Sequence, residues 1–327
     1  MPEFMIERAM MKIRPKVASE ITGIVSKTGA KTEGIFVGCA MTPHMFNTMP
    51  LEYSYDLITQ CTEVARAEGC EVIGLGAFTA VVGDAGITVA ERSKIAVTTG
   101  NSYTVATAIE GTLKACHLVG INTQDSVLAV IGATGSIGKT CARVLAPDFA
   151  RTIVIGRDPE RTQAICDELP RATASTHVED IKQADVIVTV TSSDAAIVEP
   201  QHLKLGAIIC DVSRPRDVSK KVVQERPDVL VIEGGVVKVP GKPVFNFDFG
   251  FPDGTAYACM CETMMLALEN RPESYTLGKD VSIEQVNEMQ ALADKHGFCL
   301  EGFRAFEKAV DQTSIERTRS ARLQTIS

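Results

Sequence analysis

The sequence predicts an α/β protein: a doubly wound parallel sheet, preceded by an N-terminal α/β domain and followed by C-terminal helices that pack back. Three observations support this fold class. The apolar run Val127–Ile131 suits a buried parallel strand and is too short for an isolated helix. Apolar runs and helical patterns alternate through the second half of the chain, as βα units do. Hydrophobic residues make up 45% of the 327 residues and aromatic residues 5%, which is typical of an aliphatic α/β protein.

Glycines follow the central apolar run at the spacing G-x-x-G-x-x-G, a variant of the common G-x-G-x-x-G pattern. A helix is expected next, over Lys139–Leu145. A strand, a glycine turn and a helix place backbone N–H groups and a positive helix end where a pyrophosphate can bind. We therefore expect a Rossmann-type dinucleotide site at Gly132, Ala133, Thr134, Gly135, Ser136, Ile137 and Gly138. A turn that only packs the helix on the sheet is the structural alternative.

The residue after the second predicted strand bears on the choice of cofactor. The run Thr152–Gly156 ends at Arg157, roughly where NAD-binding domains carry an acidic residue for the ribose. An arginine suits the 2′-phosphate of NADP instead. We therefore expect NADPH as the cofactor.

Three further apolar runs predict strands of the same sheet, at 184–190, 207–212 and 229–232. Ligands of such sheets lie beyond the carboxyl ends of the strands. The residues expected near the cofactor on this ground are Thr191, Ser192, Ser213 and Gly235. Ordinary turn chemistry explains these residues equally well.

The N-terminal region predicts a hairpin of strands at 21–27 and 34–39, helices at 53–68, 88–95 and 103–119, and a short strand at 71–75. Beyond the sheet we expect helices at 255–268, 283–296 and 302–310, with Thr255 as an N-cap, and then a basic tail at 313–327 without a core pattern. The expected domains are an N-terminal substrate domain at 1–120, an NADP-binding domain at 121–254 and a C-terminal helical segment at 255–327.

Composition excludes several classes of protein. The net charge of −8 gives a general nucleic-acid role no electrostatic support. No apolar run reaches the roughly 18 residues of a membrane span. The segment Met1–Lys16 lacks a signal-peptide core. The ten cysteines are scattered, as in a reduced cytoplasmic protein, and no Cys/His spacing predicts a metal site.

Cys259 is the candidate nucleophile. It lies within the first turn or so of the helix expected from Thr255, and a helix N-terminus favours thiolate over thiol. Cys261 is two residues further, about 200° around the helix, so both thiols cannot face one cleft. The other cysteines indicate small core residues. On the residues alone, a buried structural role remains the commoner one for Cys259 as well.

Five motifs occur in order along the chain: GLGAFTAVV (Gly74–Val82), TTGNSYT (Thr98–Thr104), VIGATGSIG (Val130–Gly138), EGGVV (Glu233–Val237) and YACMCETMMLALE (Tyr257–Glu269). Together they resemble the cyanobacterial type of long-chain acyl-[acyl-carrier-protein] reductase, from about Ala18 to Phe298. The resemblance implies NADPH-dependent reduction of a long-chain fatty acyl thioester, acyl-ACP or acyl-CoA, to a fatty aldehyde. It also implies that the cysteine of an Ala-Cys motif, Cys259 here, carries the acyl group.

Such chemistry needs an oxyanion site and an apolar tunnel. Candidates for the oxyanion site are Thr99, Asn101, Ser102 and the backbone at the start of the Thr255 helix. Candidates for the tunnel are Phe78, Met264, Met265 and Leu266, although helical spacing favours plain core. His44 is a possible proton donor, but a lone loop histidine is more often a solvated surface group.

Two other functions remain open. A shikimate- or amino-acid-type NADP dehydrogenase shares the domain order and needs no cysteine, but the run around Gly74–Thr79 lacks the nearby lysine that such an enzyme would use. A non-catalytic NADP-binding sensor would bind NADPH without turning over a thioester. An acyl-carrier protein would need a basic patch, for which the candidates are Lys220, Lys221, Arg317, Arg319 and Arg322. A solvated charge run is the simpler interpretation of these cations.

Overall fold

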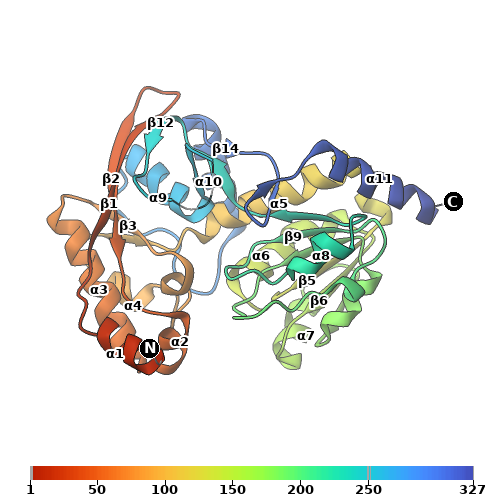
Figure 1. Ribbon diagram of the computed structural model, residues 1–327, viewed down its shortest axis with the longest axis horizontal. Helices are drawn as coiled ribbons and strands as arrows, with labels where there is room; N and C mark the ends of the chain where they lie inside the picture. The colour runs from red at the N-terminus through yellow and green to blue at the C-terminus, as the bar shows by residue number, and fades with distance from the viewer. Residues whose placement is uncertain (1–2, 249, 251, 327) are drawn as a thin grey trace. The chain divides into compact units, whose positions relative to one another are not determined.

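The computed structural model describes residues 3–248, 250 and 252–326, so Met1, Pro2, Phe249, Phe251 and Ser327 of the regions discussed above lie outside it. The chain forms two compact units (Figure 1). Unit 1 comprises Met1–Tyr103, Val237–Val281 and Asn287–Cys299, and unit 2 comprises Thr104–Val236, Ser282–Val286 and Leu300–Ser327. The first boundary falls inside helix α5 (Asn101–Val119).

Unit 2 is built on a six-stranded parallel sheet in the order β10-β9-β8-β5-β6-β7. Its strands are β5 (Val127–Ile131), β6 (Arg151–Ile155), β7 (Ala172–Ser175), β8 (Val186–Thr189), β9 (Ile208–Asp211) and β10 (Leu230–Glu233). The order runs outward in both directions from β5 and β8, as in a doubly wound dinucleotide-binding sheet. The predicted α/β fold class is confirmed. In such a sheet, ligands bind where the direction of winding reverses, which here is between β5 and β8.

The core of unit 2 explains why short apolar runs form these strands. Strands β8, β9 and β10 are buried at every position, as expected for strands covered on both faces. The helices of this unit are α5 from Thr104 onward, α6 (Ser136–Leu145), α7 (Pro159–Asp167), α8 (Lys220–Glu225) and α11 (Gln312–Ile326). Asp158 caps α7 by accepting the Arg161 N–H at 3.0 Å, and Pro159 occupies its first position.

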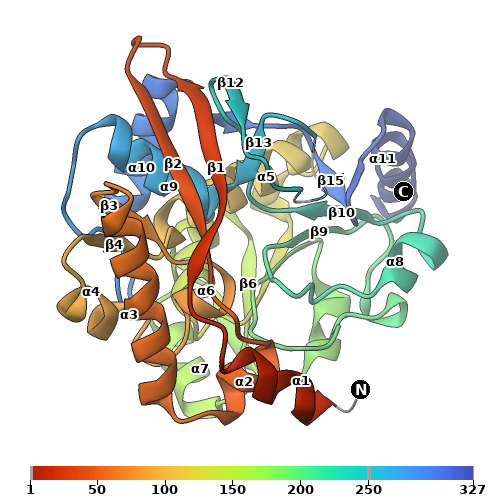
Figure 2. The same cartoon turned by 60° about the vertical axis from the view of Figure 1, so that its left-hand side comes forward.

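Unit 1 contains an antiparallel sheet in the order β12-β1-β2 and a parallel pair, β3 and β4 (Figure 2). The strands are β1 (Lys16–Val25), β2 (Lys31–Gly38), β3 (Val72–Gly74), β4 (Ala96–Thr98) and β12 (Gly241–Val244). The helices are α1 (Glu3–Met10), α2 (Pro43–Thr48), α3 (Leu51–Ala67), α4 (Ile87–Arg92), α9 (Ala258–Leu268) and most of α10 (Ile283–His296). Unit 1 also contains β13 (Thr255–Tyr257), most of β11 (Val236–Lys238) and the first residue of β14 (Cys299–Leu300).

Three predictions about the C-terminal region are wrong: the N-cap at Thr255, the helix at 302–310 and the tail at 313–327 without a core pattern. Thr255 belongs to strand β13 and caps no helix, because α9 begins three residues later. The segment expected as a helix at 302–310 contains the hairpin of β15 (Arg304–Ala305) and β16 (Lys308–Ala309). Phe306 and Glu307 form its turn with positive φ angles of 50° and 65°, which a helix does not allow.

The tail is helix α11, not a segment without a core pattern. Ile315 and Ala321 are buried, and the Arg322 guanidinium donates to Asp185 at 2.6 Å and to Ser126 at 3.2 Å. The sequence pattern did not predict a packed helix here, because part of the buried face of the helix is an arginine, Arg322. Within the part of the chain that the structure describes, no helix is both long and apolar enough to cross a bilayer.

Candidate functional site

The glycine turn of unit 2 has the geometry of a phosphate-binding turn. Gly132 follows β5 with a φ of 80°, and a Cβ there would lie 2.1 Å from the carbonyl oxygen of Val190. A Cβ on Gly138 would lie 2.4 Å from the carbonyl oxygen of Gly132. Gly135 is the N-cap of α6 and offers no side chain to the first N–H groups of that helix. The residues present therefore fit a pyrophosphate at this helix start.

Two predicted cofactor residues, Thr191 and Ser213, are joined through Asp217. This carboxylate is fully buried and accepts the Thr191 hydroxyl at 2.6 Å, the Thr191 N–H at 3.0 Å and the Ser213 hydroxyl. Ser192 lies exposed in the same turn. The Thr191 methyl group also stands 3.1 Å from where a Cβ of Gly132 would be. These side chains therefore fix the turns after β8 and β9, next to the glycine turn. Sequence reasoning missed Asp217.

Asp211, at the end of β9, makes the stability of the folded state depend on pH. Burial raises the pKa of its carboxyl to about 7, and the neighbouring Asp217 adds to the effect. The folded state therefore holds this proton more tightly than the unfolded chain. The stability that it contributes is present below about pH 4 and is lost as the pH rises through about 7.

We expect Asp211→Asn to remove this dependence. The free energy of unfolding should lose a slope approaching 1.4 kcal/mol per pH unit, about one proton's worth, between about pH 4 and 7. Denaturant unfolding at a series of pH values measures it. Identical pH profiles for the two proteins would show that Asp211 titrates normally.

Arg157 lies exposed two residues after the end of β6, the strand next to the one that precedes the glycine turn. The adjacent carboxylate, Asp158, caps α7. Arg161 from the first turn of α7 donates to the carbonyl oxygen of Thr134 in the glycine turn at 3.1 Å. Arg161 is thus a second cation at the glycine turn, and the sequence pattern did not reveal it because α7 brings it back to that turn.

Gly235 follows the edge strand β10, three strands and about 14 Å from β5. Its φ is 87°, so the turn requires glycine. The preceding Glu233 is buried and accepts hydrogen bonds from Arg214 at 2.8 Å and from Arg216 at 2.7 Å. All the predicted cofactor residues therefore lie along the carboxyl edge of one sheet, although Gly235 stands far from the glycine turn.

Cys259 lies in unit 1, as the second residue of α9. A Cβ on Gly100 would lie only 2.3 Å from the Cα atom and 2.4 Å from the Cβ atom of Cys259, so the two backbones are in direct contact. Helix α5 begins at the next residue, Asn101. The starts of two helices therefore meet at this cysteine. Their positive ends favour negative charge on the sulfur and on an acyl oxygen beside it.

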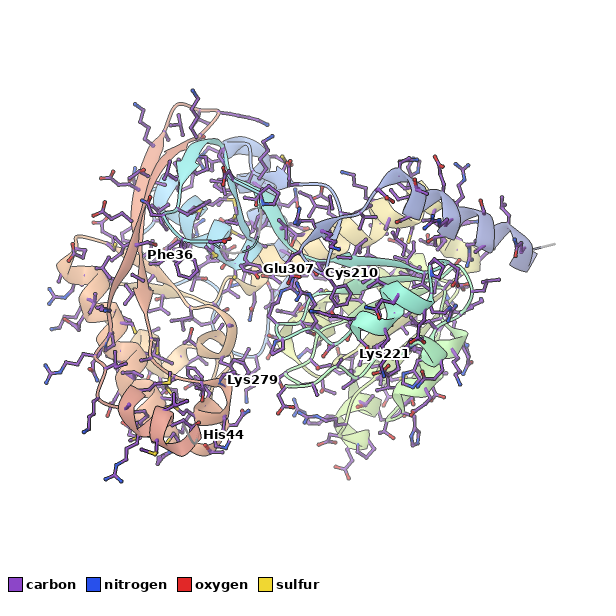
Figure 3. The ribbon with its side chains drawn as sticks, in the orientation of Figure 1. Phe36, His44, Cys210, Lys221, Lys279 and Glu307 are labelled. Carbon is purple, nitrogen blue, oxygen red and sulfur yellow. The ribbon has the colours of Figure 1, made fainter. Side chains whose placement is uncertain are left out.

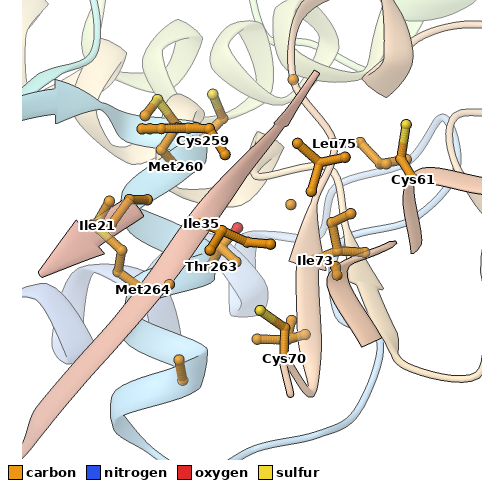
Figure 4. A pocket seen from close by; sticks show the side chains of 18 of the residues that line it. Ile21, Ile35, Cys61, Cys70, Ile73, Leu75, Cys259, Met260, Thr263 and Met264 are labelled. Atoms are coloured by element: carbon orange, nitrogen blue, oxygen red, sulfur yellow. The ribbon is translucent and has the colours of Figure 1, made fainter. Parts of the chain in front are cut away.

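Cys259 lines a cavity of about 660 Å³ within unit 1, a volume within the range of about 300–1,000 Å³ that ligand pockets occupy (Figure 4). Figure 4 shows Met260, Thr263 and Met264 of α9 beside Cys259. The rest of its largely apolar wall includes Ile21, Ile24, Ile35, Phe78, Ile73 and Leu75. A half-buried thiol thus stands at the wall of a cavity that is more apolar than polar, with Lys31, Glu33, Glu71 and Arg271 also in its lining.

Cys261 differs from Cys259 in every respect that matters here. It is 0% exposed and does not line the cavity, and burial raises its pKa well above the ordinary value for a thiol. Burial likewise raises the pKa of Cys116 and of Cys210 to about 12. All ten cysteines lie in the described part of the chain, and each is a thiol.

Other candidates separate into those at the cavity and those elsewhere. Phe78 and Met264 line the cavity, whereas Met265 and Leu266 are buried core residues outside it. The side chain of His44 is 58% exposed, lies outside the cavity lining and bonds Glu7 at 2.8 Å (Figure 3). The solvated-surface interpretation of His44 fits this position.

The proposed basic patch loses one member. Arg322 is buried in its ion pair with Asp185, so it is not available on the surface to a partner. Lys221, on helix α8 in Figure 3, stands 3.9 Å from Glu199. Among the described residues, no group of three or more His, Cys, Asp or Glu side chains is arranged to hold a metal ion.

Comparisons with known proteins agree with this fold. A family model described as shikimate / quinate 5-dehydrogenase matches residues 114–233. The aminotransferase PigE of Serratia sp. is 28% identical over 304 residues, covering 89% of this chain, while the chain spans only 35% of that protein. The long-chain acyl-[acyl-carrier-protein] reductase of Synechococcus elongatus is 25% identical over 300 residues and is covered to 87%, as is this chain.

Solved structures show looser similarity. L-tryptophan dehydrogenase from Nostoc punctiforme has a TM-score of 0.42 at 12% identity, over 98% of this chain and 80% of that one. Glutamyl-tRNA reductase from Methanopyrus kandleri has a TM-score of 0.33 at 16% identity, over 89% and 63%. The chain carries the NAD(P)-binding fold of oxidoreductases. It also resembles an acyl-[acyl-carrier-protein] reductase over most of its length.

Proposed function

We propose that this protein reduces long-chain fatty acyl thioesters, acyl-ACP or acyl-CoA, to fatty aldehydes with NADPH, through an acyl group bound to Cys259. The observation that carries the proposal is the position of Cys259, at the start of α9 and in the wall of a largely apolar cavity. A fatty acyl chain needs such a cavity next to its reacting carbonyl. The similarity to the reductase of Synechococcus elongatus supports the same assignment.

The chain's own residues account for the acyl transfer. The Cys259 thiolate attacks the thioester carbonyl, the bond from the carbonyl carbon to the carrier sulfur breaks, and the carrier leaves as a thiolate that takes a proton from solvent. The helix starts at Gly100 and at Ala258 favour the negative charge that develops on the acyl oxygen. When bound, NADPH supplies the hydride that reduces the Cys259-bound acyl group to an aldehyde.

The proposed cofactor site is the carboxyl edge of the sheet in unit 2. Gly132, Gly135 and Gly138 would hold the pyrophosphate at the start of α6. Arg157 and Arg161 would hold the 2′-phosphate that distinguishes NADPH from NADH.

We expect Arg157→Ala to weaken NADPH binding by about tenfold or more, because it removes one charged partner of the 2′-phosphate. The affinity for NADH should change by less than about threefold, since NADH lacks this phosphate. Fluorescence titration of both cofactors measures the difference. Equal losses for the two would place Arg157 elsewhere on the cofactor or in the fold.

The catalytic efficiency, kcat/KM, should depend on the length of the acyl chain. Each methylene buried in the cavity contributes about 0.8 kcal/mol, so kcat/KM should rise about fourfold per methylene until the cavity is full. Kinetics with a series of acyl-CoA substrates measures this slope. Met264→Ala should change the preferred length because Met264 lines the cavity, whereas Met265→Ala, outside the lining, should not. A flat series would show that the acyl chain binds elsewhere.

The direct test of the proposed function is intact-mass spectrometry. Incubation with a long-chain acyl-CoA or acyl-ACP, without NADPH, should add the mass of one acyl group. Adding NADPH should remove that mass and release the aldehyde. The absence of an adduct with both substrates would reject the acyl-enzyme route.

A second candidate is a shikimate- or amino-acid-type dehydrogenase, favoured by the family model that matches residues 114–233. The matched residues all lie in unit 2, so the match gives no information about the cavity in unit 1. Such an enzyme needs no nucleophile, so it would turn over its substrate normally after Cys259→Ala. It would also leave the intact mass unchanged in the experiment above.

A further inference from the structure

One buried carboxyl has no part in the mechanism above. Glu262 is 0% exposed and lies one turn after Cys259 on helix α9, where it is the only charged residue. One of its oxygens accepts the Thr98 hydroxyl at 2.5 Å and the Thr276 hydroxyl at 2.8 Å. The other accepts the backbone N–H of Tyr103 at 2.9 Å. Burial raises the pKa of this carboxyl. A buried acid is costly, so its partners are informative.

These partners surround the segment that passes Cys259. Thr98 ends strand β4, and Tyr103 lies in the first turn of α5. The Thr98 hydroxyl oxygen also accepts the N–H of Gly100 at 3.3 Å. The Thr276 hydroxyl bonds the Ser102 hydroxyl at 2.6 Å. The segment 98–103 is therefore tied on both sides of Gly100 to a carboxyl fixed on α9.

Gly100 lies in the middle of this tied segment, in contact with Cys259. With a φ of 72° and no room for a Cβ, its backbone lies directly on that of the cysteine. The segment that lies against the Cys259 backbone is thus hydrogen-bonded to Glu262. All of these residues belong to unit 1.

We propose that Glu262 is a positioning residue for Cys259: it holds Gly100 and the first turn of α5 against the thiol. Two helix starts then stabilise the thiolate. If the proposed function holds, the same clamp places α5 beside the acyl oxygen, and this second part rests on that function.

Three substitutions distinguish a positioning role of Glu262 from an effect of its charge. Glu262→Asp keeps the carboxyl but ends one methylene short of its partners. Thr276→Val keeps the carboxyl and removes one hydroxyl that binds it. Glu262→Gln keeps the shape and removes the ionisable group. The first two changes loosen a clamp, which raises the midpoint of Cys259. Thr276→Val also removes a hydrogen bond that lowers the pKa of Glu262, so by charge alone it would move that midpoint down, as Glu262→Gln would.

The experiment measures the rate at which iodoacetamide alkylates Cys259 as a function of pH, by peptide mass spectrometry. In Glu262→Asp and Thr276→Val the midpoint should move to higher pH, and the rate at pH 7 should fall about threefold to tenfold, because the thiolate loses the ordered start of α5. No variant changes the other titratable groups near Glu262 or in the cavity lining, which are Cys261, Tyr275, Lys31, Glu33, Cys39, Cys61, Cys70, Glu71 and Arg271.

The matched control is Glu269→Gln, the same type of change at the C-terminal end of α9, where Glu269 bonds His296 at 2.7 Å. It should leave the alkylation profile of Cys259 unchanged. Thermal unfolding shows which variants are folded, and Thr276→Val serves if the Glu262 variants are not. Unchanged midpoints in Glu262→Asp and Thr276→Val would overturn the proposal, whether or not Glu262→Gln lowers the midpoint.

Alkylation requires no acyl substrate, so it separates this inference from the proposed function. If the wild-type protein is never acylated but the midpoints of the variants shift as described, the positioning role of Glu262 is supported and the reductase assignment is rejected. A wild-type protein that is acylated, with variants whose midpoints do not move, would keep the reductase and lose the clamp.

Discussion

Replacing Cys259 with alanine should abolish acylation and lower turnover of acyl thioesters by at least about a thousandfold, as loss of a nucleophile does in other covalent enzymes. The cavity and the glycine turn are untouched by this change, so NADPH should bind as before. Intact mass after incubation with acyl-CoA and steady-state NADPH oxidation measure the two effects.

The matched control for this prediction is Cys261→Ala, on the same turn of α9. Cys261 is buried away from the cavity, so its loss should cost about 1 kcal/mol of stability and leave the acyl adduct intact. If Cys261→Ala lost the adduct and Cys259→Ala kept it, the assignment of the nucleophile would be wrong.

The second large effect is expected at Gly132. An alanine there would place its Cβ 2.1 Å from the carbonyl oxygen of Val190, in a backbone conformation with a φ of 80°. The turn must move, and the pyrophosphate site moves with it. Gly132→Ala should therefore weaken NADPH binding by more than about a hundredfold. Acylation of Cys259, which lies in unit 1, should continue without discharge by NADPH.

Gly29→Ala separates crowding from backbone strain. Gly29 has a similar φ of 87°, but nothing lies within 4 Å of its Cβ position. It should lose only about 1 kcal/mol of stability and bind NADPH normally. Calorimetry and cofactor titration on both variants provide the comparison. Normal NADPH affinity in Gly132→Ala would remove the glycine turn from the proposed site.

Local sequence was enough for the central features of unit 2. The run Val127–Ile131 can bury a strand only inside a covered sheet, and a turn of glycines between strand and helix has few other uses. The position of Arg157 after β6 follows from the same alternation. In unit 1, the helical period separated Cys259 from Cys261, and the structure places the first in the cavity wall and the second in the core.

Other features depend on residues far apart in the chain. Helix α11 looked like a solvated tail, because its buried face includes Arg322, whose partner Asp185 is 137 residues away. In the hairpin of the 302–310 segment, the Phe306 N–H donates to Glu233, which is 73 residues away, at 2.5 Å. A charged residue in a sequence pattern is expected to be exposed. It can be buried when a partner far away in the chain pairs with its charge, and only the tertiary structure shows that partner.

By itself, the sequence determined the α/β class and the glycine turn, since each depends on neighbours within one or two elements. Local residues made Cys259 only a candidate, and the resemblance to a reductase family made it the thiol to test. Only the tertiary structure brought Gly100 onto Cys259, closed the cavity around it, and joined Glu262 to Thr98 and Thr276. The physical reason is that these contacts depend on tertiary packing. Gly100 and Thr98 lie more than 150 residues from the α9 residues that they contact, and Thr276, although only 14 residues from Glu262, lies beyond the end of α9, so no local period encodes the contacts.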